Sequence, residues 1–127
     1  MRIGFDVSQT AEDKAGCGFF ADQIIRTLAE IDTANEYLLY PAFYKYFNPD
    51  IHKVTQPEAV NSRVYFRGMT FMEMVSGWNT KMVNRSQWLG SPDIVHSNSF
   101  TCVKDHDAKI VFTVYDVLPL LHPELPR

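Results

Sequence analysis

Residues 20–40, FADQIIRTLAEIDTANEYLLY, contain a helix pattern, a turn and a strand pattern in succession. Apolar residues recur at helical spacing in the first part: Phe20, Ile24, Leu28 and Ile31, with Ala21 and Ile25 widening the stripe. The polar residues 32–35 predict a turn, and Glu36–Tyr40, which Pro41 ends, predicts a strand. We therefore expect a helix packed on a sheet, as in α/β proteins.

The rest of the chain continues this alternation. Four further β-prone runs lie at residues 2–7, 63–67, 93–96 and 109–115. A helix pattern spans Met69–Leu89, and the sequence Gly90-Ser91-Pro92 ends it. Strands that alternate with helices predict an α/β fold, with a parallel, Rossmann-like sheet flanked by helices in one domain over residues 1–127.

Composition excludes several classes of protein. The chain has 127 residues, 46% of them hydrophobic, and a net charge of -3, which favours a globular domain without affinity for nucleic acid. Neither a signal peptide nor a run of transmembrane length is present, so we expect a cytoplasmic protein with reduced Cys17 and Cys102. We expect no metal site, because His106 and its neighbouring aspartates have no second ligand group at matching spacing.

The helix of the opening stretch follows a G-x-G sequence formed by Gly16 and Gly18. A dinucleotide fingerprint needs its first glycine directly after the first strand, but eight residues separate Val7 from Gly16, and Tyr40 stands where a ribose-binding acid would be. A nicotinamide cofactor is therefore not expected. The glycine amides lie at the positive end of a helix dipole, which suits a phosphate; the alternative is an ordinary turn into the helix.

Polar residues also follow the other strands at the edge where ligands of parallel sheets bind. Asp6 and His96 end two of the strands, and Asp116 follows a third. For Asp6 the alternative role is a cap of the following loop, and for His96 a hydrogen-bonded structural histidine. We expect Gly18, His96 and Asp116 to line one depression at this edge.

Three segments of the sequence together form a further pattern. They are MRIGFDVSQT followed by AGCGFFADQIIRTLAEIDTANEYLLY, then DIVHSNSF, and then KIVFTVYDVLPLLHPE. Together they resemble the N-terminal domain of the family-4 glycosyltransferases of the GT-B fold. The resemblance covers almost the whole chain and is most specific in its opening and closing segments. It implies a retaining, metal-independent enzyme without a further cofactor, which transfers a sugar from a nucleotide-sugar donor to a glycan or lipid-linked acceptor in polysaccharide or glycolipid synthesis.

The resemblance also assigns roles to residues. It implies a donor-facing loop of Gly16, Cys17, Gly18 and Phe19, and an acceptor side that includes Asp6, His96 and Ser97. Tyr115 and Asp116 would form the catalytic element, with Tyr115 where the family usually has a histidine that touches the donor sugar. The nucleotide pocket and an acidic E-x7-E motif belong to the family's C-terminal domain, so we expect residues 1–127 to be an inactive N-terminal domain of a longer enzyme.

Other interpretations remain open. A stand-alone flavodoxin-like binding or signalling module is the alternative function. The helix expected at Met69–Leu89 could lie on the inner face of a membrane, because it carries aromatic residues together with Lys81 and Arg85. We favour its burial on the sheet as a crossover helix. We also expect a lone domain to expose apolar surface and to self-associate.

Overall fold

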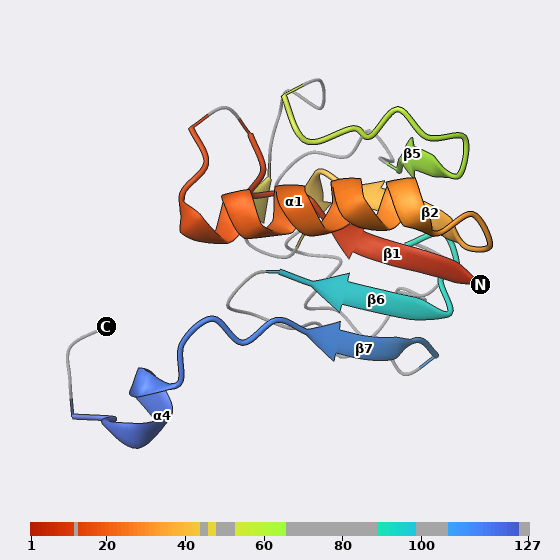
Figure 1. The fold of residues 1–127 in the computed structure, drawn as a ribbon. Coiled ribbons are helices and arrows are strands. Elements are labelled where there is room, and N and C mark those ends of the chain that lie inside the picture. Colours follow the sequence, from red (N-terminus) through yellow and green to blue (C-terminus); the bar gives the residue numbers. More distant parts are fainter. Residues whose placement is uncertain (12, 44–45, 48–52, 66–88, 99–106, 125–127) are drawn as a thin grey trace.

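A computed structural model describes residues 1–11, 13–43, 46–47, 53–65, 89–98 and 107–124. Its main sheet has five parallel strands in the order β5-β2-β1-β6-β7 (Figure 1). They are β1 Arg2–Asp6, β2 Glu36–Tyr40, β5 Ser62–Val64, β6 Ile94–Ser97 and β7 Lys109–Phe112. If the five strands are renumbered 1 to 5 by their order along the chain, their order in the sheet is 3-2-1-4-5. This is the order of Rossmann folds and not the 2-1-3-4-5 order of flavodoxin. The expected parallel, Rossmann-like sheet is confirmed.

Four shorter or flanking elements complete the described structure. Helix α1 (Gly16–Ile31) lies along one face of the sheet (Figure 1). Strands β3 (Ala42–Phe43) and β4 (Tyr46–Phe47) pair as a small antiparallel unit, and α4 (Leu118–Leu121) follows β7. Within the described ranges, no helix is both long enough and apolar enough to span a membrane. The helix expected at 69–89 lies outside these ranges except for Leu89.

The core forms between α1 and the sheet face that it covers. Buried side chains from both elements meet there: Phe5, Val7, Ala21, Ile25, Tyr37 and Leu39, together with Val54. The buried positions of α1 itself are Gly18, Ala21, Asp22, Ile25 and Ala29. The predicted stripe is therefore partly wrong, since Phe20 and Ile31 are exposed and the stripe is centred on Ala21 and Ile25. Small residues let the helix lie close to the strands, which leaves the larger neighbours at its flanks.

The opposite face of β1 is covered by an aromatic ring. Gly4 has no side chain, and a Cβ at this position would overlap the ring of Tyr40. The Tyr40 hydroxyl donates a hydrogen bond to the Leu89 carbonyl (2.8 Å), so the buried ring links β2 to the residues that precede β6. Gly90 then turns the chain with a φ of 81°, a conformation that suits glycine, at the place where Gly90-Ser91-Pro92 was expected to end a helix.

Several element boundaries differ from those expected. Helix α1 begins at Gly16, so the G-x-G sequence lies inside the helix and not before it, and β6 begins at Ile94, one residue later than predicted. Strand β7 ends at Phe112 although the β-prone sequence continues to Tyr115. Its neighbour β6 ends at Ser97, whose carbonyl accepts the last ladder bond, from the Thr113 amide (3.0 Å). Residues with a high strand propensity cannot extend a ladder beyond the end of the partner strand.

Candidate functional site

The candidate site lies at the carboxyl ends of β1 and β6. These two strands are neighbours, and the strand order reverses between them, since the chain builds the sheet outward on one side of β1 and then on the other. Ligands of open α/β sheets bind in the crevice outside such a switch point. The start of α1, the end of β6 and the residues after β7 all meet at this end of the sheet (Figure 1).

Asp6, the last residue of β1, is buried at the centre of this region. Its carboxylate accepts hydrogen bonds from the Ser8 amide (3.0 Å), the Ser8 hydroxyl (2.6 Å) and the Asn98 amide (3.3 Å). Burial raises the pKa of Asp6 to about 6, and the bonds from Ser8 and Asn98 oppose that rise only in part. Asp6 thus ties the loop after β1 to the end of β6, which is the capping role described above as the alternative.

A chain of polar side chains runs from Asn98 to His96. The Asn98 side-chain amide donates to the Asp6 carbonyl (3.0 Å), and the Asn98 oxygen accepts from the Thr113 hydroxyl (3.0 Å). Because the single hydroxyl hydrogen of Thr113 is used in this way, its oxygen must accept from His96 Nε2 at 3.0 Å. This fixes the tautomer of neutral His96 with the proton on Nε2. Burial also lowers the pKa of His96, so the ring is neutral at physiological pH.

The His96 ring is fixed on its other side by β1. It packs edge-on against Phe5, its register partner, with ring centroids 4.7 Å apart. Ser97, the next residue, is fully buried, and its carbonyl belongs to the ladder with β7. His96 is therefore an oriented, half-buried imidazole, whereas Ser97 contributes to the strand that positions it.

The two glycines at the start of α1 have different environments. A Cβ at Gly18 would overlap the Gln9 carbonyl oxygen and lie 2.7 Å from Lys14 Cβ, so Gly18 is buried beneath the loop that follows β1. At Gly16 a Cβ would meet no atom within 4 Å. The N-cap residue is Ala15, whose methyl group cannot accept a hydrogen bond, and the first turn carries no acidic residue. Of the two glycines expected to face a ligand, Gly16 borders open space and Gly18 does not.

Tyr115 reaches the first turn of α1 from the far side of β6. Its hydroxyl donates to the Cys17 carbonyl (3.3 Å), and its ring packs edge-on against Phe20 with centroids 5.6 Å apart. Burial, followed by the charges that Cys17 and Asp6 carry when ionised, raises the pKa of Tyr115 to about 12. The phenol therefore stays protonated and acts as a hydrogen-bond donor. Tyr115 therefore lies beside the glycine segment at the start of α1.

Asp116 and Phe19 lie at the exposed rim. The Asp116 carboxylate accepts from the Leu118 amide (2.7 Å) and so caps the short helix α4. Phe19 is 56% exposed, and the Lys14 ammonium lies 5.2 Å from the centroid of its ring. Cys17 has a free, half-buried thiol, and Cys102 lies outside the described residues.

A charged clasp holds the loop between β1 and α1. Asp22, buried in α1, accepts from Lys14 (2.9 Å), from Arg26 (2.7 Å) and from the Thr55 hydroxyl (2.6 Å). Burial raises the pKa of Asp22, but these three donors together hold it below its ordinary value. The described residues of this loop, 8–11 and 13–15, are thereby held against the start of the helix, where the Gln9 carbonyl leaves no room for a side chain at Gly18.

The sequence did not point to Ser8, Asn98 or Thr113, although all three hold Asp6 or His96 in place. Their only signal was that polar residues directly follow buried strands. Comparison of the chain with known protein families, with curated proteins and with solved structures finds no match. Among the residues that the structure describes, no group of three or more histidine, cysteine or acidic side chains is placed to hold a metal ion.

Proposed function

We propose that the chain is the N-terminal, acceptor-side domain of a cytoplasmic, nucleotide-sugar-dependent retaining glycosyltransferase of the GT-B type. The observation that carries the proposal is the start of α1: an open glycine and an uncapped first turn stand at the switch point of a Rossmann-ordered sheet. Such a terminus supplies backbone N–H groups and a positive dipole end to a phosphate. The three sequence segments that resemble the family support the same function.

In this proposal the residues divide into three roles. Gly16 lets the donor phosphate approach the backbone of the first turn, and Gly18 lets that turn pack on the loop below it. Tyr115, a protonated phenol, takes the place of the family's histidine beside the donor sugar and holds the Cys17 carbonyl. His96, neutral and oriented by Thr113 and Phe5, borders the acceptor. Asp116 contributes charge at the rim.

The experiment is a titration of isotope-labelled chain with UDP-glucose and GDP-mannose, followed by backbone amide chemical shifts. We expect weak binding with the largest shifts at Gly16, Cys17 and Gly18, because the nucleotide itself would be held by a C-terminal domain. Inorganic pyrophosphate should move the same amides, since the contact is with the phosphates. The chain alone should show no sugar transfer and no donor hydrolysis, because one wall of the cleft cannot stabilise the transition-state charge.

A matched pair of variants makes the result decisive. Gly16→Val places a side chain in open space, so it should leave the fold intact and abolish the amide shifts. Val60→Ala, a change at a fully exposed residue near β5, should leave them unchanged. If the amides of the first turn do not move at saturating sugar nucleotide, or move equally in Gly16→Val, the helix start is only a turn and the proposal fails.

A further inference from the structure

The hydrogen bonds that lead to His96 form a chain with one direction. The Asn98 side-chain nitrogen donates to the Asp6 carbonyl (3.0 Å), so the Asn98 side-chain oxygen is the atom that accepts from the Thr113 hydroxyl (3.0 Å). The Thr113 oxygen is then left to accept from His96 Nε2 (3.0 Å). Because a backbone carbonyl can only accept, the Asp6 carbonyl at the start of the chain fixes the role of every atom that follows.

The second ring nitrogen of His96, Nδ1, is left as a hydrogen-bond acceptor. A neutral imidazole that carries its proton on Nε2 has a lone pair on Nδ1. The part of the chain that the structure describes has one buried side-chain polar atom without a partner, and this atom is Ser62 Oγ. Nδ1 has no partner among the described residues either, so it is not buried and solvent reaches it.

His96 is also held in place at the edge where a ligand is expected. Phe5 packs against the ring at an interplanar angle of 81°, and Thr113 holds Nε2. The residue lies next to the last position of β6, beside the switch point between β1 and β6. A histidine with a purely structural role would use both nitrogens inside the fold, whereas His96 uses one and leaves the other open.

We propose that His96 determines specificity on the acceptor side: its Nδ1 accepts a hydrogen bond from a hydroxyl group of a neutral sugar or polyol. Thr113 and Asn98 are the positioning residues that keep Nδ1 an acceptor. An ionised phosphate or carboxylate is excluded from this position, because it would set its own lone pairs against that of Nδ1. The inference rests on the proposed function in placing the acceptor at this side of the site.

Imidazole nitrogen chemical shifts of the chain labelled with ¹⁵N-histidine test the direction of the hydrogen bonds. The chain has four histidines, and His96→Gln identifies the His96 signals. At about pH 8, where the ring is neutral, we expect the Nε2–H tautomer alone. Thr113→Val removes the acceptor of that proton but keeps the shape of the side chain, so the Nδ1–H tautomer should appear. Thr113→Ser keeps the hydroxyl and should restore the wild-type pattern.

Two results would overturn the polarity of this chain of bonds. One is a wild-type His96 ring that carries its proton on Nδ1. The other is a Thr113→Val ring with the same tautomer as the wild type.

Titration with methyl α-glucoside, a neutral probe that offers hydroxyl groups, tests the specificity. It should move the Nδ1 shift of His96, whereas inorganic phosphate at the same concentration should leave that shift unchanged. Thr113→Val should weaken glucoside binding by about fivefold, the effect of losing one oriented hydrogen bond. Val60→Ala, at a fully exposed residue that precedes β5, is the control and should bind as the wild type does.

The outcomes separate this inference from the proposed function. If the glucoside does not move Nδ1 of His96, or if phosphate moves it equally, the hydroxyl site is overturned, while pyrophosphate shifts in the first turn of α1 would still support the donor site. If the glucoside moves Nδ1 but sugar nucleotides and pyrophosphate leave the first-turn amides unchanged, the hydroxyl site is supported and the glycosyltransferase proposal fails.

Discussion

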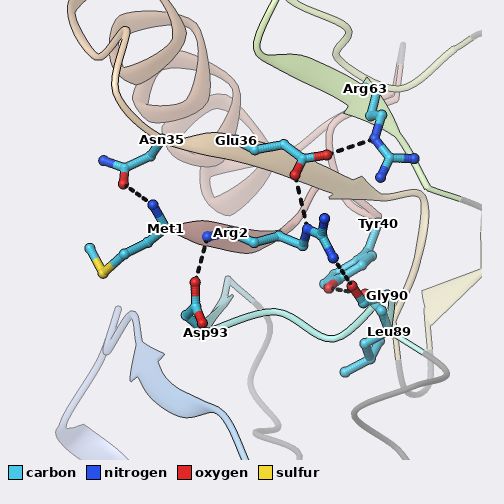
Figure 2. Close-up of polar contacts among 9 residues, drawn as sticks. All are labelled: Met1, Arg2, Asn35, Glu36, Tyr40, Arg63, Leu89, Gly90 and Asp93. Atoms are coloured by element: carbon cyan, nitrogen blue, oxygen red, sulfur yellow. Dashed lines mark hydrogen bonds and ion pairs between the residues drawn. The ribbon is translucent and has the colours of Figure 1, made fainter.

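The two ends of the sheet hold their polar groups in opposite ways. At the amino end, exposed charges pair across strand starts (Figure 2): Arg2 Nε donates to Glu36 (2.9 Å), and Arg63 Nε donates to the other Glu36 oxygen (3.0 Å). Arg2 also binds the Gly90 carbonyl (2.9 Å), and its backbone amide donates to Asp93 (2.7 Å). The Met1 ammonium donates to Asn35 (2.8 Å). Here opposite charges compensate each other and remain in contact with water.

At the carboxyl end the buried carboxyl group of Asp6 has no opposite charge beside it among the described residues. Asp6 receives only neutral donors, from Ser8 and Asn98, and the dipole of α1 begins without an acidic cap. A buried carboxyl group without an opposite charge lowers the stability of the fold, and so does a helix start without a capping side chain. The exposed ion pairs of the amino end carry neither cost. The difference indicates that the amino end serves the fold, whereas the carboxyl end retains uncompensated polar groups, as binding sites commonly do.

The largest expected effect concerns the clasp at the carboxyl end. Asp22→Ala leaves Lys14 without its carboxylate and frees the Thr55 hydroxyl, and breaking such a buried pair costs about 3–5 kcal/mol. Urea unfolding measures this loss. Arg26→Ala, which removes a half-exposed partner of the same carboxylate, should cost less than about 1 kcal/mol. Equal losses in the two variants would show that the clasp does not hold the loop.

The two glycines of α1 should differ in the same measurement. Gly18→Ala forces a methyl group against the Gln9 backbone and should lower the free energy of unfolding by about 2–3 kcal/mol. Gly16→Ala adds a methyl group in open space and should be neutral, or stabilising by up to about 1 kcal/mol through helix propensity. If Gly18→Ala is as stable as Gly16→Ala, Gly18 is not a packing residue.

The buried carboxyl group predicts an unusual pH dependence. The pKa of Asp6 is about 6 in the folded chain against an ordinary value of 3.8, so the folded state binds this proton more tightly than the unfolded state. The Asp6 contribution is therefore favourable at low pH and is lost as pH rises through about 6, by about 2–3 kcal/mol in total.

Comparison with Asp6→Asn isolates this contribution from that of the other carboxyl groups. The difference in unfolding free energy, wild type minus variant, should fall as pH rises from about 4 to about 7. A difference that stays constant over this range would mean that Asp6 has the same pKa in the folded and unfolded states, near its ordinary value.

The smallest effect belongs to the amino end. Glu36→Gln removes the charge that Arg2 and Arg63 share, and the pairs are well exposed, with Glu36 37% accessible. We expect a loss below about 1 kcal/mol, which disappears in high salt. A loss comparable to that of Asp22→Ala, or one independent of salt, would remove the contrast between the two ends of the sheet.

Local patterns in the sequence determined the framework of this protein. The bounds of β2, Glu36–Tyr40, are those that the sequence predicted, and the alternation of elements predicted the parallel sheet. Both follow from periodicity and from Pro41, which act over a few residues. The position of Tyr115 at the same edge as the first turn of α1 also followed, because the carboxyl ends of parallel strands lie at one edge.

Only the tertiary structure decided how the site is built. The bonds between Asp6 and Asn98 join residues 92 apart in the chain, and no local pattern specifies such a pairing. Gly16 and Gly18 are equivalent in a motif but differ in what surrounds them, because the loop after β1 folds over only one of them. The exposure of β7 likewise depends on which segments lie beside it. The physical reason is that burial and hydrogen-bond partners are properties of the assembled sheet, whereas periodicity is a property of each segment alone.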